Sequence, residues 1–335
     1  MSGEKRRQVT VVLPVFNEAD NVGPVYARLA GVAAQRKDLD FEFLFVDDGS
    51  RDSTFAEVLG LRDLDARVSV IRLARNVGHQ LALTAGLDAS LAADAVIIMD
   101  ADLQDPPEVA LRLIERWESG AEVVYAQRRT RQDSTAKRVT AYVYYWLLSR
   151  ISDVEIPRNV GDFRLMDRKV VVEVSRYREH DRYLRGIVAH VGFRQEAVLF
   201  DRDPRAAGKT GYTWRRMRKL AADGVLGFST APLRLISRVG VAISLFSAAL
   251  GLYVLWVRLF HPETSVPGWA FLGVGMFMLG GLQLLMMGVI ASYLGRVYVE
   301  AQSRPLYSIT SSARGQAPSV LTGHDVPVMT DVTTG

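Results

Sequence analysis

Cysteine is absent from this chain of 335 residues, and histidine is scarce. Without thiols the chain forms no disulfide, no zinc–thiolate site and no cysteine nucleophile. No two of the five histidines have the spacing of paired metal ligands, so we expect them to be structural or surface residues. They are His79, His180, His190, His261 and His324.

Signatures of three common enzyme classes are also missing. The first predicted strand runs into PVFNEAD, and not into the Gly-x-Gly-x-x-Gly turn of nicotinamide and flavin dehydrogenases. No Gly-x-Ser-x-Gly nucleophile turn of the α/β-hydrolases is present. RAAGKT at 205–210 resembles a phosphate loop, but a Walker motif requires glycine where the chain has Asp203. We interpret this segment as a mobile basic loop.

Charge is missing from two long stretches in the carboxyl-terminal third, residues 239–257 and 269–293. Each is long enough to cross a hydrocarbon core of about 30 Å as a helix. We therefore expect a two-helix transmembrane hairpin over residues 233–298, with spans at about 239–259 and 269–293.

The arginines that flank these stretches predict an orientation. Arg234 and Arg238 precede the first stretch, while Arg296 and Arg304 follow the second. By the positive-inside rule, both ends of the hairpin then lie in the cytoplasm. The sequence thus predicts a multi-pass protein of the cytoplasmic membrane with a cytoplasmic amino-terminal domain.

The segments on either side of the hairpin have different compositions. Residues 212–232 mix Trp214, Met217 and Leu220 with Arg215 and Lys219, which predicts an amphipathic juxtamembrane helix in contact with membrane lipid. Residues 299–335 are rich in Ser, Thr, Gly and Pro and contain few apolar residues. We expect them to form a disordered cytoplasmic tail, because they bury too little to become ordered.

Short apolar runs alternate with helical patterns in residues 1–211. The runs are β-branched or aromatic, as in buried parallel strands. The predicted strands are residues 9–15, 41–46, 68–73 and 95–99, and the predicted helices are residues 22–34, 53–61 and 80–91. This order predicts an α/β catalytic domain with an open, doubly wound, mostly parallel sheet.

Polar residues follow each predicted strand directly. In open α/β sheets, ligands bind beyond the carboxyl ends of the strands, so these residues should lie along one edge and form a site. They are Asn17, Glu18, Asp47, Asp48, Asn76, Gly78, Asp100 and Asp102.

Two carboxylates follow the strand at 95–99. Asp100 and Asp102, with Gln104 close by, have the oxygen ligands that a hard divalent cation prefers, and such a cation would bridge a diphosphate. The alternative is a simple turn or helix start, because Asp105-Pro106-Pro107 follows. Asp47 and Asp48 form a second acidic turn, which either holds a base or ribose edge or precedes a helix capped by Asp52 or Ser53.

Six segments, in order, closely resemble the polyprenyl-phosphate glycosyltransferases, enzymes of glycosyltransferase family two with the GT-A fold. This group includes dolichol-phosphate mannose synthase and the bactoprenol glucosyltransferases. The segments are PVFNE (14–18), VDDGS (46–50), NVGHQLA (76–82), DADLQDPP (100–107), GDFRLM (161–166) and RAAGKTGY (205–212). The resemblance extends from about Val9 to the second apolar stretch.

The resemblance implies roles for particular residues. A Mg²⁺ or Mn²⁺ ion would be held by Asp100, Asp102 and Gln104, and Asp162 and Asp102 would be catalytic. The nucleotide sugar would be bound by Pro14, Phe16, Glu18, Asp48, Gly78, Asp100, Ala101, Arg205 and Lys209. The acceptor phosphate would be bound by Arg128, Arg131 and Lys137, for which the alternative is a solvated helical face. For Asp162 the alternative is a turn carboxylate that pairs with Arg164.

The implied reaction moves a hexose from a nucleotide diphosphate sugar to polyprenyl phosphate by direct displacement, with inversion at the anomeric carbon. UDP-glucose is the favoured donor, and GDP-mannose and UDP-N-acetylhexosamines are the alternatives. The acceptor phosphate is already ionised near neutral pH, so positioning and leaving-group stabilisation should matter more than a strong base. No nucleic acid partner is expected, and a homo-oligomer stays an open alternative.

The sequence is less consistent with two other functions. A processive polysaccharide synthase would carry a Gln-x-x-Arg-Trp motif, but the corresponding region reads RYLRG at 182–186. A non-enzymatic sugar-nucleotide sensor would have no need of Asp102, Asp162 and the basic residues of an acceptor site. The sequence therefore favours an enzyme of the polyprenyl-phosphate type.

Overall fold

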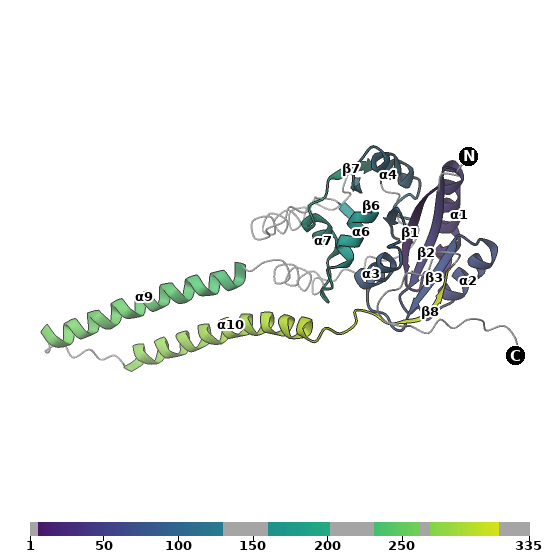
Figure 1. Cartoon of the computed structure of the whole chain (residues 1–335). Coiled ribbons are helices and arrows are strands. Elements are labelled where there is room, and N and C mark those ends of the chain that lie inside the picture. Colours follow the sequence, from purple (N-terminus) through teal and green to yellow (C-terminus); the bar gives the residue numbers. More distant parts are fainter. Residues whose placement is uncertain (1–5, 130–159, 202–230, 261–268, 315–335) are drawn as a thin grey trace. The chain divides into compact units, whose positions relative to one another are not determined.

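The computed structural model describes residues 6–129, 160–201, 231–260 and 269–314 (Figure 1). A sheet with its covering helices and the segment from Pro305 onward belong to one compact unit. The long helices α9 (Ala231–Phe260) and α10 (Trp269–Ala301) belong to a second unit.

The first unit contains one sheet of eight described strands in the order β7-β5-β6-β4-β1-β2-β3-β8. β1 pairs in parallel with β2 and β4, and β2 pairs in parallel with β3. β6 is antiparallel to its neighbours β4 and β5, and β7 is parallel to β5. The strands are β1 (Arg7–Val15), β2 (Leu39–Asp47), β3 (Val68–Leu73), β4 (Ala95–Ile98), β5 (Val123–Arg128), β6 (Val160–Asp167), β7 (Gln195–Phe200) and β8 (Ile309–Ala313).

Helices cover both faces of this sheet (Figure 1). The four strands and three helices predicted from residues 9–99 are all present, with ends that differ by at most three residues. The helices of this unit are α1 (Ala19–Gln35), α2 (Thr54–Leu64), α3 (His79–Ala89), α4 (Val109–Glu118), α6 (Arg168–Ser175) and α7 (Leu184–His190). The mostly parallel α/β sheet predicted from the sequence is thus confirmed.

Alternate residues of the central strands enter two separate cores. Val11 of β1 packs in the core under α1, α2 and α4, and its neighbour Val12 packs in the core under α3, α6 and α7. Both side chains are at most 1% exposed. Burial of an aliphatic side chain contributes about 1.5–3 kcal/mol to the free energy of folding. A strand whose side chains are buried on both faces therefore stabilises the fold strongly. This explains why continuous apolar runs predicted these strands.

Helix α3 approaches the sheet closely at Gly86. A Cβ atom at this position would lie 2.2 Å from Cγ1 of Val12 and 3.2 Å from Cγ2 of Val46. The missing side chain lets α3 lie against β1 and β2. The amino-terminal end of α3 is thereby fixed beside the carboxyl ends of these strands.

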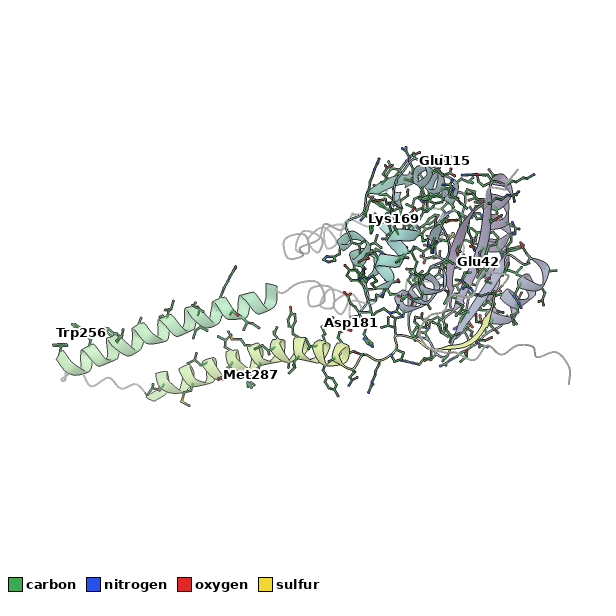
Figure 2. All side chains as sticks on the ribbon, viewed as in Figure 1. Glu42, Glu115, Lys169, Asp181, Trp256 and Met287 are labelled. Atoms are coloured by element: carbon green, nitrogen blue, oxygen red, sulfur yellow. The ribbon has the colours of Figure 1, made fainter. Side chains whose placement is uncertain are left out.

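The expectation of a disordered tail over residues 299–335 is wrong for its first part. α10 extends to Ala301, and β8 pairs with β3 as an antiparallel edge strand. Beyond β8, Arg314 lies 3.6 Å from the buried Glu42. Glu42 belongs to β2 (Figure 2). The edge of β3 offered unpaired backbone groups, so even a short polar strand gains hydrogen bonds there.

The described part of the second unit contains two apolar helices, α9 and α10, with exposed side chains. Trp256 of α9 and Met287 of α10 are 51% and 58% exposed and project outward from their helices (Figure 2). Among the described residues, one helical stretch, Leu279–Ala301, is long and apolar enough to cross a membrane. It overlaps the second predicted span, whereas the first predicted span lies in α9, several of whose side chains are outside the described part. Residues 231 and 232 begin α9. The rest of the amphipathic helix predicted over 212–232 lies outside the residues that the structure describes.

Candidate active site

Polar residues gather at the carboxyl ends of β1, β2 and β4, as the sequence predicted. Two residues in the loops beyond these strands have left-handed backbone conformations, Asn17 at φ 53° and Leu103 at φ 58°. Such angles are uncommon for residues other than glycine and mark tight turns of the chain. They fold the loops back at the edge of the sheet where the candidate site lies.

Asp48 fixes the loop that leads into α3. Its two carboxylate oxygens accept hydrogen bonds from the backbone N–H groups of Val77 at 2.8 Å and Gly78 at 2.9 Å. Burial raises the pKa of Asp48, and these two hydrogen bonds oppose that shift. Gly78 adopts φ 97°, which a side chain would strain, and is the residue before α3. Asp48 and Gly78, both predicted to bind the nucleotide sugar, thus determine where His79 lies.

His79 lies between two carboxylates, which corrects the expectation that it is a structural or surface histidine. Its Nε2 atom is 3.2 Å from Oδ2 of Asp162 and 3.5 Å from Oδ1 of Asp100. Desolvation lowers the pKa of His79, but the hydrogen bond with Asp162 and the charges of Asp100 and Asp162 outweigh it and raise that pKa above its ordinary value. The side chain remains 42% exposed, so it faces the open side of the site.

Asp162, on β6, is the most extensively hydrogen-bonded carboxylate of the site. Arg185 donates to both of its oxygens, at 2.8 and 3.2 Å, and the side-chain amide of Gln80 donates to Oδ2 at 3.2 Å. Burial alone would raise the pKa of Asp162, but the hydrogen bonds from His79 and Arg185 and the charges of Arg185 and Arg164 hold it far below its ordinary value. Asp162 is therefore ionised at any physiological pH.

The expected alternative partner of Asp162, Arg164, bonds elsewhere. Its guanidinium donates to the backbone oxygens of Gly161 at 3.0 Å and Asp162 at 3.3 Å. Burial lowers the pKa of Arg164 to about 10, although the charge of Asp162 opposes this shift. The carboxylate of Asp162 is instead paired with Arg185, from α7, so it is not a simple turn residue.

Asp100, Asp102 and Gln104, the predicted metal ligands, lie in the turn after β4. Burial raises the pKa of Asp100 to about 6; the charge of His79 lowers it, whereas those of Asp162, Asp102 and Asp105 raise it. Oδ1 of Asp102 accepts a hydrogen bond from the backbone N–H of Gln104 at 3.1 Å, and the Gln104 side chain is buried.

This set of donors fits a hard divalent cation. Carboxylate and amide oxygens are the ligands that Mg²⁺ and Mn²⁺ take, and negative charge accumulates at Asp100. Within the described ranges, no three His, Asp or Glu side chains form a ready metal site. A cation here would therefore take further ligands from a bound diphosphate and water.

The other residues predicted to bind the nucleotide sugar have different exposures. Pro14 in β1 and Ala101 after β4 are buried, and Phe16 is 40% exposed. The Glu18 carboxylate accepts a hydrogen bond from the side chain of Asn21, and its backbone N–H donates to Oγ1 of Thr54 at 2.9 Å. Glu18 thus connects the start of α1 with α2. Arg205 and Lys209 lie outside the described residues.

Arg128, at the end of β5, is the described member of the predicted acceptor-phosphate set; Arg131 and Lys137 lie outside the described residues. Its Nη2 atom is 3.5 Å from Oδ1 of the buried Asp105. A Cβ atom on Gly161 would lie 3.5 Å from the same nitrogen. Arg128 thus lies next to the residue that precedes Asp162.

Three residues that surround Asp162 were not predicted from the sequence: His79, Gln80 and Arg185. Gln80 also accepts a hydrogen bond from the backbone N–H of Leu184 at 2.9 Å, so it connects α3 with α7. His79 and Gln80 directly follow Gly78, which was predicted to bind the nucleotide sugar. This position in the sequence was the signal that could have placed them at the site. Arg185 is 23 residues from Asp162, and no local pattern pairs them.

Known proteins resemble the chain over most of its length. A model of the glycosyl transferase family 2 matches residues 10–175. The glycosyltransferase YkcC of Bacillus subtilis (strain 168) is 45% identical over 307 residues, which are 91% of this chain and 94% of that protein. The SfII prophage-derived bactoprenol glucosyl transferase of Shigella flexneri is 38% identical over 309 residues, which are 92% of this chain and 99% of that protein.

A solved structure of a mannosyltransferase, PcManGT from Pyrobaculum calidifontis in complex with GDP-Man and Mn²⁺, superposes with a TM-score of 0.49 at 17% identity. The match covers 86% of this chain and 87% of that one. The sequence relatives reach far above the level at which a shared family is secure, and each extends over about nine tenths of the chain. The chain therefore belongs to glycosyl transferase family 2 and is a glycosyltransferase with an α/β fold of the GT-A type.

Proposed function

We propose that the chain transfers glucose from UDP-glucose to a polyprenyl phosphate at the cytoplasmic face of a membrane, with inversion at the anomeric carbon. The observation that carries this proposal is the 38% identity to a bactoprenol glucosyl transferase over 92% of the chain. GDP-mannose and UDP-N-acetylhexosamines remain the alternative donors, because discrimination depends on pocket shape.

Asp100, Asp102 and Gln104 would hold a Mg²⁺ or Mn²⁺ ion together with the donor diphosphate. When bound there, the cation would neutralise the charge of the departing nucleoside diphosphate. Burial raises the pKa of Asp100, and the charges of Asp162, Asp102 and Asp105 raise it further. These neighbouring carboxylates support the assignment, since the site has negative charge to be neutralised. Asp48, Gly78, Pro14, Phe16 and Glu18 would shape the nucleotide pocket around it.

Asp162 would act by its fixed charge and position, and not as a strong base. Hydrogen bonds from His79 and Arg185 hold its pKa far below the ordinary value, so it takes up a proton poorly. A phosphate acceptor is already an anion near neutral pH and needs little deprotonation. The negative charge of Asp162 can instead stabilise positive charge that develops on the sugar ring in the transition state.

Arg128 would bind the acceptor phosphate beside Asp162, together with Arg131 and Lys137. Its placement next to Gly161 supports this role, because the phosphate would then meet the donor near Asp162. Arg205 and Lys209 would close over the donor diphosphate by charge-assisted hydrogen bonds. These positively charged side chains would together hold the two phosphorylated substrates in line for displacement.

The membrane arrangement proposed here is a hairpin of two spans within α9 and α10. The candidate span Leu279–Ala301 supports the second. For the first, the uncharged residues 239–257 and the flanking Arg234 and Arg238 are the support. Such an anchor would keep the active site close to the head groups of a lipid acceptor.

Transfer to undecaprenyl phosphate in lipid nanodiscs tests the proposal. The purified chain should transfer glucose from radiolabelled UDP-glucose faster than it transfers sugar from GDP-mannose or UDP-N-acetylglucosamine, and only when Mg²⁺ or Mn²⁺ is added. Asp102→Asn should reduce the rate at least about 100-fold, as expected when charge stabilisation of the leaving group is lost. A faster rate with another donor would replace UDP-glucose as the assigned donor. If no sugar-linked lipid forms with undecaprenyl phosphate while the donor is consumed, this acceptor is excluded.

A further inference from the structure

One nitrogen atom lies within reach of carboxylates from two different strands. Nε2 of His79 lies 3.2 Å from Asp162 on β6 and 3.5 Å from Asp100 after β4. Because ionised carboxylates only accept hydrogen bonds, we assign the single hydrogen that this nitrogen can carry to Nε2. One hydrogen cannot make two good hydrogen bonds at once. Asp100 and Asp162 therefore compete for the same donor.

The two competitors differ in their other partners. Asp162 also accepts hydrogen bonds from Arg185 and Gln80. Asp100 shares its turn with Asp102, and among the described side chains His79 forms its ion pair. A cation that binds Asp100 would take over this carboxylate and remove it from the competition for Nε2.

We propose that His79 is a positioning residue that couples cation binding at Asp100 to the orientation of Asp162. The inference rests on the proposed function in that Asp100 is a cation ligand and Asp162 lies beside the reacting sugar. Without a cation, the hydrogen on Nε2 is shared between the two carboxylates. With a cation on Asp100, this hydrogen bonds to Asp162 alone, and His79, Gln80 and Arg185 together hold the Asp162 carboxylate in one orientation.

The coupling has a thermodynamic consequence that is independent of turnover. If His79 is drawn toward Asp162, it interferes less with a cation at Asp100. Replacement of Asp162 by Asn weakens the pull on His79, so the imidazole bonds more fully to Asp100 and competes with the cation. The substitution should therefore weaken cation binding more when His79 is present than when it is absent.

A double-mutant cycle on Mn²⁺ binding tests this coupling in the full-length protein. Isothermal titration calorimetry would measure Mn²⁺ affinity in the presence of UDP for the wild type, His79→Ala, Asp162→Asn and the double variant. The loss caused by Asp162→Asn should be at least about threefold larger with His79 than without it, beyond the error of an additive pair. Equal losses in the two backgrounds would overturn the coupling, because only the long-range charge of Asp162 would then be at work.

Kinetics with the preferred donor separate a positioning role from a merely structural one. His79→Ala should lower kcat about 10- to 100-fold, the effect of losing a hydrogen bond to a charged group, and leave the donor KM within about threefold. His79→Gln retains an N–H donor and should recover part of the loss, while His190→Gln, on the exposed end of α7, should change neither constant.

If kcat of His79→Ala is unchanged, or if kcat and UDP affinity fall together with the melting temperature, the positioning role is wrong. If the wild type transfers no sugar but the Mn²⁺ cycle shows coupling, the proposed reaction fails and the link between Asp100 and Asp162 stands.

Discussion

The hydroxyl of Tyr307 donates a hydrogen bond to Oδ2 of Asp88 at 2.6 Å, across 219 residues of sequence. Asp88 lies near the end of α3, the helix that begins at His79, and also pairs with Arg178 at 2.7 Å. Burial, with the charge of Asp88, raises the pKa of Tyr307 well above its ordinary value. The segment that follows α10 is therefore attached to the helix that supplies His79 and Gln80 to the site.

Tyr307→Phe should lower the free energy of unfolding by about 1–2 kcal/mol, because the hydroxyl bonds a charged acceptor in a partly buried place. The melting temperature in detergent should fall by a few degrees. Tyr177→Phe serves as the control, because the Tyr177 ring contacts His190 and not Asp88. This substitution should leave the melting temperature unchanged. Equal melting temperatures for Tyr307→Phe and the wild type would mean that the hydroxyl contributes nothing to the attachment of this segment.

Two glycines in helices should respond to alanine with opposite signs. Gly86→Ala puts a Cβ 2.2 Å from a methyl group of Val12 in the core, and such overpacking costs about 1–3 kcal/mol. Gly60→Ala, on the exposed side of α2, meets nothing within 4 Å and should stabilise the chain by about 1 kcal/mol through helix propensity. Chemical denaturation would measure both. A stabilised Gly86→Ala variant would contradict the close packing of α3 on β1.

The sequence predicted the acidic edge of the site but not the side chains that complete it. Asp100 and Asp102 were predictable because the polar turn begins where a buried strand ends, and the position of parallel strand ends follows from topology. The environment of His79 was not predictable from the sequence. Its partner Asp162 is 83 residues away and lies on the antiparallel strand β6. A lone histidine has no spacing signal.

The edge strand β8 was not predicted from the sequence, for a related reason. ITSSA is short, polar and set in a segment of disordered composition, so its local pattern does not indicate a strand. It is ordered by unpaired backbone groups of β3 and by the attachment of Tyr307 to Asp88. Tertiary context decides the structure of such a segment, because its own side chains bury little.

Arg128→Ala should weaken acceptor binding more than donor binding. A charge-assisted contact with a phosphate contributes enough that the KM for polyprenyl phosphate should rise about tenfold or more, while the affinity for UDP should change by less than about threefold. The neighbouring Arg129, paired with Asp201 on the surface, gives the control Arg129→Ala, which should change neither. Since Asp105 is buried beside Arg128, melting temperature must be recorded, and parallel losses of both affinities would indicate misfolding.

Cation binding should depend on pH through Asp100. Its pKa is raised to about 6, above the ordinary value of an aspartate, so the group is protonated below about pH 6 and ionised above it. A cation must displace this proton in acid, and the apparent Mn²⁺ affinity should fall about tenfold per pH unit below pH 6 and be nearly constant from pH 7 to 8. Titrations between pH 5 and 8 would measure it. Asp100→Asn should abolish the dependence, and a wild-type affinity that stays flat from pH 5 to 7 would contradict it.

The absence of cysteine makes the proposed topology directly testable, because any introduced cysteine is the sole thiol in the chain. A hairpin of two spans with both ends in the cytoplasm places residues 258–268 on the opposite side of the membrane from Ser303, which follows α10. In intact cells, Ser265→Cys should react with an impermeant maleimide, and Ser303→Cys should react only after the membrane is permeabilised. If only Ser303→Cys were labelled in intact cells, the hairpin would have the opposite orientation. The active site would then face away from cytoplasmic nucleotide sugars.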